Sequence, residues 1–133
     1  MSEIVVDASV ALCWFAREND TVAANRLIRS SADLIAPSLM LAELANSLWK
    51  KARLGEIDGD IASAAMNEIR RFIPQFFELA DLAAPALALA RELDRSAYDC
   101  FYLALARRRA APLGLLGRPR RPSRPARAVD PGY

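Results

Sequence analysis

The chain has 133 residues, 53% of them hydrophobic and 8% aromatic, which is enough for one domain with a real core and too apolar for a disordered chain. It contains no histidine, so imidazole bases, Ser-His triads and histidine metal sites are excluded, and acid–base or metal chemistry must rest on carboxylates. No apolar run reaches the roughly 18 residues of a membrane span. The N-terminus lacks the basic start and long apolar region of a secretion signal, so we expect a cytoplasmic protein.

The net charge of +2 hides an uneven distribution. Residues 1–99 carry 10 basic and 15 acidic side chains, whereas residues 100–133 carry 8 arginines and a single acid, Asp130. A basic end beside an acidic body is compatible with contact to a polyanion, although a solvated, irregular segment explains it more plainly. Cys13 and Cys100 stand among apolar neighbours and predict small buried side chains, because two lone cysteines form no zinc spacing.

Short apolar runs alternate with helical patterns along the chain. Strands are predicted at about 4–6, 34–36, 76–79 and 111–113. Helices are predicted at about 8–17, 20–30, 38–54, 58–72, 83–93 and 98–109. We expect Ser38 to cap the third of these helices, Gly55 to end it, and Pro74 to end the fourth. The alternation predicts right-handed βαβ units and a parallel sheet covered on both faces.

The character of the chain changes after Pro112. The stretch that follows is rich in Arg, Pro and Gly and shows neither helical nor strand periodicity. We therefore expect a domain over residues 1–113 and an irregular tail over residues 114–133. Our hypothesis for the tail is a reading-frame shift, because Arg, Pro and Gly are what GC-rich codons give out of register. A basic tail that contacts RNA phosphates is the alternative.

Three acids stand where a globular chain normally prefers apolar residues. Asp7 ends the first strand, Glu43 lies within an apolar helix, and Asp99 lies at the start of another. A carboxylate in apolar surroundings is costly unless a hydrogen bond, a cation or a metal compensates it. Convergence on one divalent ion would explain all three together. The carboxyl ends of parallel strands form the crevice in which such sheets bind ligands, and Asp7 is expected there.

Each acid also has an ordinary structural explanation. Asp7 could cap the helix that follows it by accepting from first-turn amides. Glu43 could lie on a solvated face, although Asn46 and Ser47 follow it at helical spacing and extend a polar stripe. Asp99 could simply be favoured by the helix dipole. Taken singly, the residues leave both interpretations open.

The acids belong to three segments with a distinctive order and spacing. These segments are Ile-Val-Val-Asp-Ala-Ser-Val-Ala-Leu at 4–12, Pro-Ser-Leu-Met-Leu-Ala-Glu-Leu-Ala-Asn-Ser-Leu at 37–48, and Ser-Ala-Tyr-Asp-Cys-Phe-Tyr-Leu-Ala-Leu-Ala at 96–106. In this order they resemble PIN-domain ribonucleases, above all the VapC-type toxins of prokaryotic toxin–antitoxin pairs. The resemblance covers residues 4 to about 112. It implies an α/β, PIN-like three-layer sandwich with a short parallel sheet of four or five strands and helices on both faces.

The resemblance also implies a site and a function. Asp7, Glu43 and Asp99 would be the catalytic, metal-binding acids, and Ser9, Asn46 and Ser96 their polar supports. The chain would be a metal-dependent endoribonuclease, the toxin of a type II toxin–antitoxin pair, cleaving structured RNA such as tRNA or rRNA. Mg²⁺ or Mn²⁺ fits this chemistry, because both ions prefer carboxylate oxygen and can activate water where no histidine is present.

The implied partners are the RNA, a cognate antitoxin protein and a second copy of the chain. We expect a dimer surface around Leu27, Leu48 and Trp49. The arginines at 107–109 could contact phosphates, or they could simply form a charged helix end.

One feature departs from the family pattern. The family usually carries a fourth acid just after the next strand, and here no acid appears between Pro112 and Asp130. One possible codon choice for residues 114–119, moved by one base, reads Val-Cys-Ser-Ala-Asp, which contains the expected acid. The missing acid supports an alternative function, a catalytically impaired PIN-like module that binds antitoxin or RNA without cleavage.

A phospho-acceptor receiver domain is a third possibility, because it also has an acid after a parallel strand. Such a domain would need paired acids there and a late lysine. Asp7 stands alone, and no lysine follows Lys51.

Overall fold

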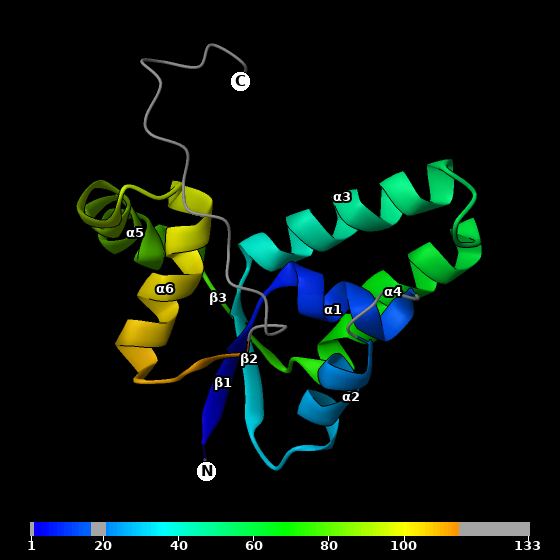
Figure 1. Ribbon diagram of the computed structural model, residues 1–133, viewed down its shortest axis with the longest axis horizontal. Helices are drawn as coiled ribbons and strands as arrows, with labels where there is room; N and C mark the ends of the chain where they lie inside the picture. The colour runs from blue at the N-terminus through cyan, green and yellow to red at the C-terminus, as the bar shows by residue number, and fades with distance from the viewer. Residues whose placement is uncertain (1, 17–20, 115–133) are drawn as a thin grey trace.

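Four short parallel strands form the centre of the protein in this computed structural model, which describes residues 2–16 and 21–114 (Figure 1). The strands are β1 (Glu3–Val6), β2 (Asp33–Pro37), β3 (Gln75–Phe77) and β4 (Leu113–Gly114), in the sheet order β3-β2-β1-β4. The helices are α1 (Ala8–Phe15), α2 (Thr21–Arg29), α3 (Leu39–Arg53), α4 (Gly59–Phe72), α5 (Leu79–Leu93) and α6 (Ala97–Arg109). None of the described helices is long and apolar enough to cross a membrane.

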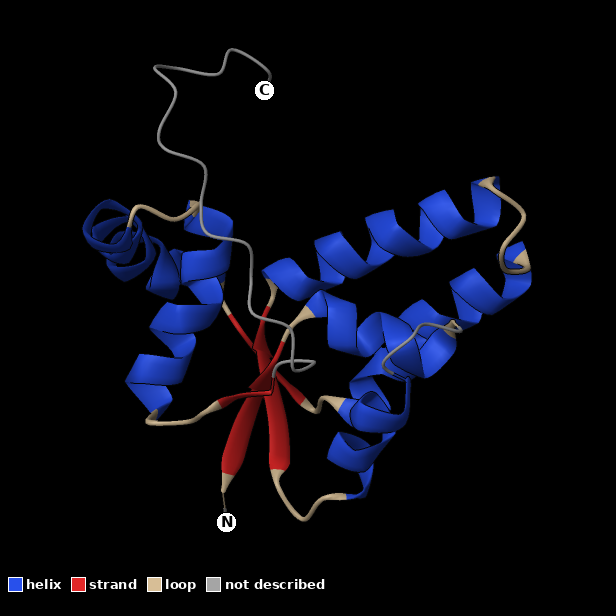
Figure 2. Cartoon of the chain, in the orientation of Figure 1, coloured by secondary structure: helices blue, strands red, loops and turns tan. Residues whose placement is uncertain are grey.

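Helices cover both faces of the sheet (Figure 2). On one face α1 packs against α2, α3 and α4, and on the other α6 packs against β1 and β2 with α5 outside it. The core lies between these layers, and Val5 and Val6 of the central strand are fully buried. This arrangement confirms the α/β, PIN-like three-layer sandwich with a short parallel sheet that the sequence resemblance implied.

The carboxyl edge of the sheet gathers the starts of several helices. Because all four strands are parallel, their carboxyl ends meet at one edge, from which α1 and α3 depart (Figure 1). Helix α6 begins at the same edge and runs back toward the opposite one (Figure 1). β1 pairs with β2 on one side and with β4 on the other, so the strand order reverses at β1. Ligands bind at such a reversal in open parallel sheets.

Two predicted boundaries are wrong, and packing explains one of them. The strand predicted at 76–79 ends at Phe77, and α5 begins at Leu79 rather than at residue 83, although Pro85 lies inside it. Three side chains at helical spacing, Leu82, Ala86 and Leu89, are buried along α5. Their burial offsets the hydrogen bond that a proline removes from a helix interior.

The predicted helix ends have mixed outcomes. Ser38 stands at the N-cap of α3, but its side chain makes no capping hydrogen bond, so that prediction is wrong. Gly55 follows α3 with φ +75°, the left-handed conformation that glycine favours, and this confirms its role as the stop. Asp58 caps α4, and its side chain accepts from the amide of Asp60.

Burial changes the surface expected for a dimer. Leu48 is only 2% exposed and belongs to the core, so its assignment to that surface is wrong. Trp49 is 55% exposed, and the guanidinium carbon of Arg53 lies 5.4 Å from its ring centroid. Leu27 is half-buried against the core. Cys13 and Cys100 are buried, as predicted.

The end of the described chain overlaps the predicted tail by one residue. Gly114 pairs with Val6 in β4, and a Cβ atom at this position would lie 2.9 Å from Cγ2 of Ile4, so a larger residue would force the Ile4 side chain to shift. The rest of the tail, including Asp130 and the position expected for a fourth acid, lies outside the described residues.

Candidate active site

Asp7 stands at the carboxyl end of β1 and begins α1. Its Oδ1 accepts hydrogen bonds from the Ser9 hydroxyl at 2.7 Å and from the Val10 amide at 3.0 Å. The backbone is extended at Asp7, with φ −94° and ψ 172°, as expected of an N-cap residue. The capping explanation for this acid is therefore confirmed. It is compatible with a second role, because the half-buried carboxylate lies at the edge where ligands bind.

Glu43 lies in the second turn of α3. It is not fully exposed, so it does not lie on a solvated face of the helix. It is half-buried, and its Oε1 accepts a hydrogen bond of 2.6 Å from the hydroxyl of Tyr102 in α6. The Tyr102 side chain is almost completely buried, with 3% exposed. This bond joins helices from opposite faces of the sheet.

The pKa of the Tyr102 hydroxyl is raised, and the charge of Asp7 is one of the causes. Burial raises the pKa of its hydroxyl far above the ordinary range, and the hydrogen bond to Glu43 and the negative charges of Glu43 and Asp7 raise it further. A backbone hydrogen bond with Ala8, at the start of α1, acts in the opposite direction. The Tyr102 hydroxyl therefore keeps its proton and donates it to the hydrogen bond with Glu43.

Asp99 occupies the first turn of α6, one turn before Tyr102. Its amide donates to the hydroxyl of Ser96, the N-cap residue, at 3.3 Å. Residues three apart lie on the same side of a helix, so Asp99 and Tyr102 share one face of α6. Asp99 thus stands in the first turn of α6, as expected, and α6 begins at the carboxyl edge of the sheet (Figure 1).

The predicted supports have different surroundings. Ser9 donates to Asp7, and Ser96 caps the turn that carries Asp99. Asn46 is exposed on α3, and no hydrogen bond between the described residues joins it to Glu43. Tyr102 was not predicted from the sequence, because it stands in an apolar run where a tyrosine is equally suited to packing.

In the part of the chain that the structure describes, the three acids do not form a compact cluster. Within residues 2–16 and 21–114, no three Asp, Glu or Cys side chains are grouped closely enough to hold one metal ion. Glu43 is hydrogen-bonded to Tyr102, and Asp99 shares a face of α6 with that tyrosine. Clustered carboxylates repel one another, and a bound cation relieves that repulsion. The donor set, carboxylate oxygens with hydroxyls beside them, fits a hard ion such as Mg²⁺ or Mn²⁺.

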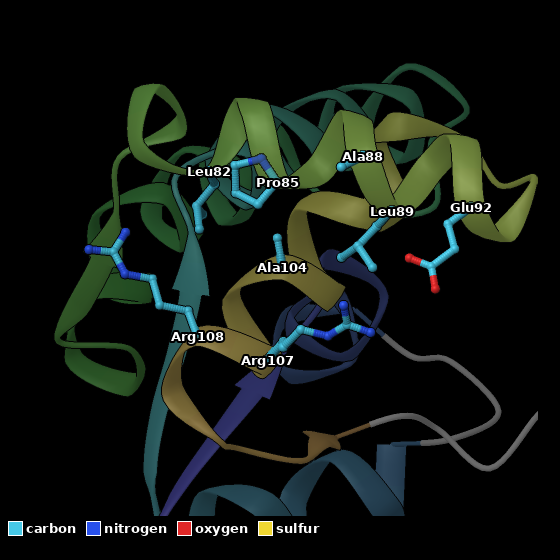
Figure 3. A pocket seen from close by; sticks show the side chains of 8 residues that line it. All are labelled: Leu82, Pro85, Ala88, Leu89, Glu92, Ala104, Arg107 and Arg108. Atoms are coloured by element: carbon cyan, nitrogen blue, oxygen red, sulfur yellow. The ribbon is translucent and has the colours of Figure 1, made fainter.

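A pocket of about 350 Å³ lies elsewhere, between α5 and α6 (Figure 3). It is lined by Leu82, Pro85, Ala88, Leu89, Glu92, Ala104, Arg107 and Arg108. Each helical residue turns by about 100°, so Ala104 and Arg107 project from the side of α6 opposite Tyr102. The pocket is therefore separate from the acids.

The arginines at the end of α6 face different surroundings. Arg107 and Arg108 line the pocket, whereas Arg109 donates to both carboxylate oxygens of Glu3, at 2.9 and 3.0 Å. The pair lies at the amino end of β1, away from the edge that carries Asp7. Arg109 is therefore a structural contact here rather than a phosphate ligand beside the acids.

Comparison with known proteins agrees with this fold and order of residues. The family model described as PIN domain matches residues 4–113. Ribonuclease VapC3 from Pyrobaculum aerophilum is 33% identical over 106 residues, which are 78% of this chain and 81% of that protein. The crystal structure of PAE2754 from Pyrobaculum aerophilum is similar with a TM-score of 0.61 at 27% identity, covering 84% of this chain and 72% of that one. The chain therefore belongs to the PIN-domain family, and its resemblance to the VapC-type ribonucleases is confirmed.

Proposed function

We propose that the protein is a metal-dependent endoribonuclease and the toxin of a type II toxin–antitoxin pair. One observation carries the proposal: Glu43 of α3 is hydrogen-bonded to the buried Tyr102 of α6, one turn after Asp99, and Asp7 begins α1 at the same carboxyl edge of the sheet. Membership of the PIN-domain family and similarity to a protein named as a ribonuclease support the same activity.

Asp7, Glu43 and Asp99 are the residues that would hold a Mg²⁺ or Mn²⁺ ion, because carboxylate oxygens are the ligands both ions prefer. When bound, such an ion activates water and neutralises the charge that develops on the phosphate during phosphodiester cleavage. The site offers no other strong general base, since the chain has no histidine.

The chain's own contribution is to fix the carboxylates before the substrate arrives. The Ser9 hydroxyl and the Val10 amide set the orientation of the Asp7 carboxylate, and the Ser96 cap sets the turn that carries Asp99. Both acids stand at helix starts, which are rigid elements of the fold. A site built in this way needs little rearrangement during the reaction, which favours catalysis.

The substrate and partners follow from the family type. We infer that the substrate is a structured RNA, such as tRNA or rRNA, met in the cytoplasm. An antitoxin protein would block the acidic edge, and a second copy of the chain would complete a homodimer.

The test is an RNA cleavage assay with purified full-length protein, total RNA and Mg²⁺ or Mn²⁺. We expect the wild type to cleave RNA and the Asp7→Asn and Asp99→Asn variants to lose cleavage. Asp58→Asn is the matched control, because Asp58 caps α4 as Asp7 caps α1, but at a helix far from the carboxyl edge. Asparagine also caps helices, so each substitution removes charge and leaves the cap. Equal cleavage by the wild type and the Asp7→Asn and Asp99→Asn variants would refute the assigned site.

The second candidate function is a PIN-like module that binds antitoxin or RNA without cleaving it. The sequence favours it in one respect, because no acid follows Pro112 before Asp130. In the same assay, a wild-type protein that binds Mn²⁺ and antitoxin but leaves RNA intact would support this module over the nuclease.

A further inference from the structure

We propose that Tyr102 is a positioning residue for the metal site, in that its hydroxyl fixes the carboxylate of Glu43 and leaves the charge of that carboxylate available to a divalent cation. The proposal rests on the proposed nuclease function and deepens it. The geometry of its hydroxyl carries the inference.

The first argument is the hydrogen bond itself. The Tyr102 hydroxyl lies 2.6 Å from Oε1 of Glu43, within the 2.5–2.7 Å range typical of O–H donors to ionised carboxylates. Tyr102 is 3% exposed, so its hydroxyl must find its partner within the protein. Among the described residues that are not exposed, no buried side-chain nitrogen or oxygen lacks a hydrogen-bond partner.

The second argument is rigidity. A tyrosine ring has two side-chain torsions, and the Tyr102 ring is packed in the core with Cys100 and Leu105 of the same helix. A glutamate has three torsions and, when free, samples many rotamers. A bond from a buried ring therefore restricts Glu43 far more than Glu43 restricts the ring. Tyr102 therefore orients Glu43, rather than the reverse.

The third argument is charge. A phenol hydroxyl is neutral, so it orients the Glu43 carboxylate without cancelling its negative charge. Arginine would do both, as Arg109 does for Glu3 at the other end of β1. A carboxylate that is oriented but still negative is what a cation site requires, because an ion pair within the protein would compete with the metal.

The fourth argument is the place of Tyr102 in the fold. Its hydroxyl bonds across the sheet to Glu43 of α3, on the opposite face from α6. On its own helix, Asp99 lies one turn earlier on the same face. Tyr102 thus fixes Glu43 of α3 from the helix that carries Asp99.

The experiment compares Tyr102→Phe with Tyr98→Phe in the full chain. Both variants remove one hydroxyl from α6 and keep the ring, but Tyr98 is 48% exposed. We measure Mn²⁺ affinity by calorimetric titration without RNA, kcat and KM with RNA, and thermal stability. Loss of a group that orients a metal ligand typically costs about tenfold or more in metal affinity, so we expect that change for Tyr102→Phe and none for Tyr98→Phe. The RNA KM should change little, and kcat should fall.

A purely structural role for Tyr102 predicts a different result. In that case Tyr102→Phe would lower the melting temperature but keep the wild-type Mn²⁺ affinity, which would overturn the inference while leaving the proposed function intact. A wild-type protein that binds no Mn²⁺ and cuts no RNA would overturn the proposed function and this inference with it.

A second pair of variants tests whether Tyr102 acts through Glu43. Glu43→Gln removes the charge that the phenylalanine variant would leave without its donor. We expect Glu43→Gln and the double variant Glu43→Gln/Tyr102→Phe to bind Mn²⁺ equally weakly, because Tyr102 acts through Glu43. A further loss of affinity in the double variant would show that Tyr102 acts by another route and would overturn the inference.

Discussion

The carboxylates at the two ends of the sheet have different kinds of hydrogen-bond donor. At the amino end, Glu3 of β1 is bound through both oxygens by Arg109, and this contact lowers the pKa of Glu3. At the carboxyl end, Asp7 accepts from a hydroxyl and an amide, and Glu43 accepts from the Tyr102 hydroxyl. A cationic partner cancels the charge of a carboxylate, whereas neutral donors only fix its position. The comparison separates Glu3, whose charge an arginine neutralises, from Glu43, which a neutral hydroxyl orients.

The largest expected effect is on the rate of RNA cleavage, when glutamate is replaced by glutamine at each end of the sheet. Glu43→Gln should lower the rate of RNA cleavage by about 100-fold or more, because a metal ligand must cost at least as much as the groups that orient it. Glu3→Gln should leave the rate within about twofold of wild type. The measurement is the initial rate on one RNA substrate under saturating Mn²⁺. Similar losses in both variants would remove the distinction between the two ends.

The sheet was predictable because its strands are short, apolar and separated by helical patterns. Ile4, Val5 and Val6 gave β1 without ambiguity, and Asp58 marked the start of α4 correctly. The start of α5 was not predictable in the same way. Pro85 is a local signal against a helix, and only the tertiary packing of α5 against α6 outweighs it.

The site was predictable in part. Asp7 and Asp99 were placed at helix starts by their neighbours in sequence, because capping is a local interaction. The bond between Glu43 and Tyr102 joins residues 59 positions apart, and no local pattern encodes it. Tyr102 was hidden in an apolar run, where a tyrosine is equally suited to packing. Its hydroxyl became informative only once the fold placed α3 beside α6.

A smaller effect should separate the two roles of Asp7. Asp7→Asn keeps a capping side chain and should keep stability close to that of wild type, whereas Asp7→Ala should cost about 1 kcal/mol of folding free energy. Both variants should lose cleavage, because both remove the charge. Chemical denaturation measures the first quantity and the RNA assay the second. If Asp7→Asn retained cleavage, Asp7 would be a cap and nothing more.

The smallest effect concerns the paired acid at the amino end. The pKa of Glu3 lies below its ordinary value of 4.5, chiefly because Arg109 donates to its carboxylate. A group whose pKa is lowered by folding contributes stability that is present above its unfolded pKa and is lost as the pH falls through the folded pKa. The melting-temperature difference between wild type and Glu3→Gln should therefore be small and constant from neutral pH down to about pH 5, and it should shrink below that.

Salt supplies the control for this last prediction, because exposed ion pairs are screened. Raising the salt concentration at neutral pH should reduce the same difference, while the effect of Glu43→Gln on RNA cleavage, compared with wild type in the same buffer, should persist. A difference for Glu3→Gln that grew as the pH fell would mean that Glu3 is stabilised in its protonated form. In that case the ion pair with Arg109 would not explain the pH dependence of the melting temperature. Glu3 would then not be an example of a carboxylate whose charge is neutralised within the fold.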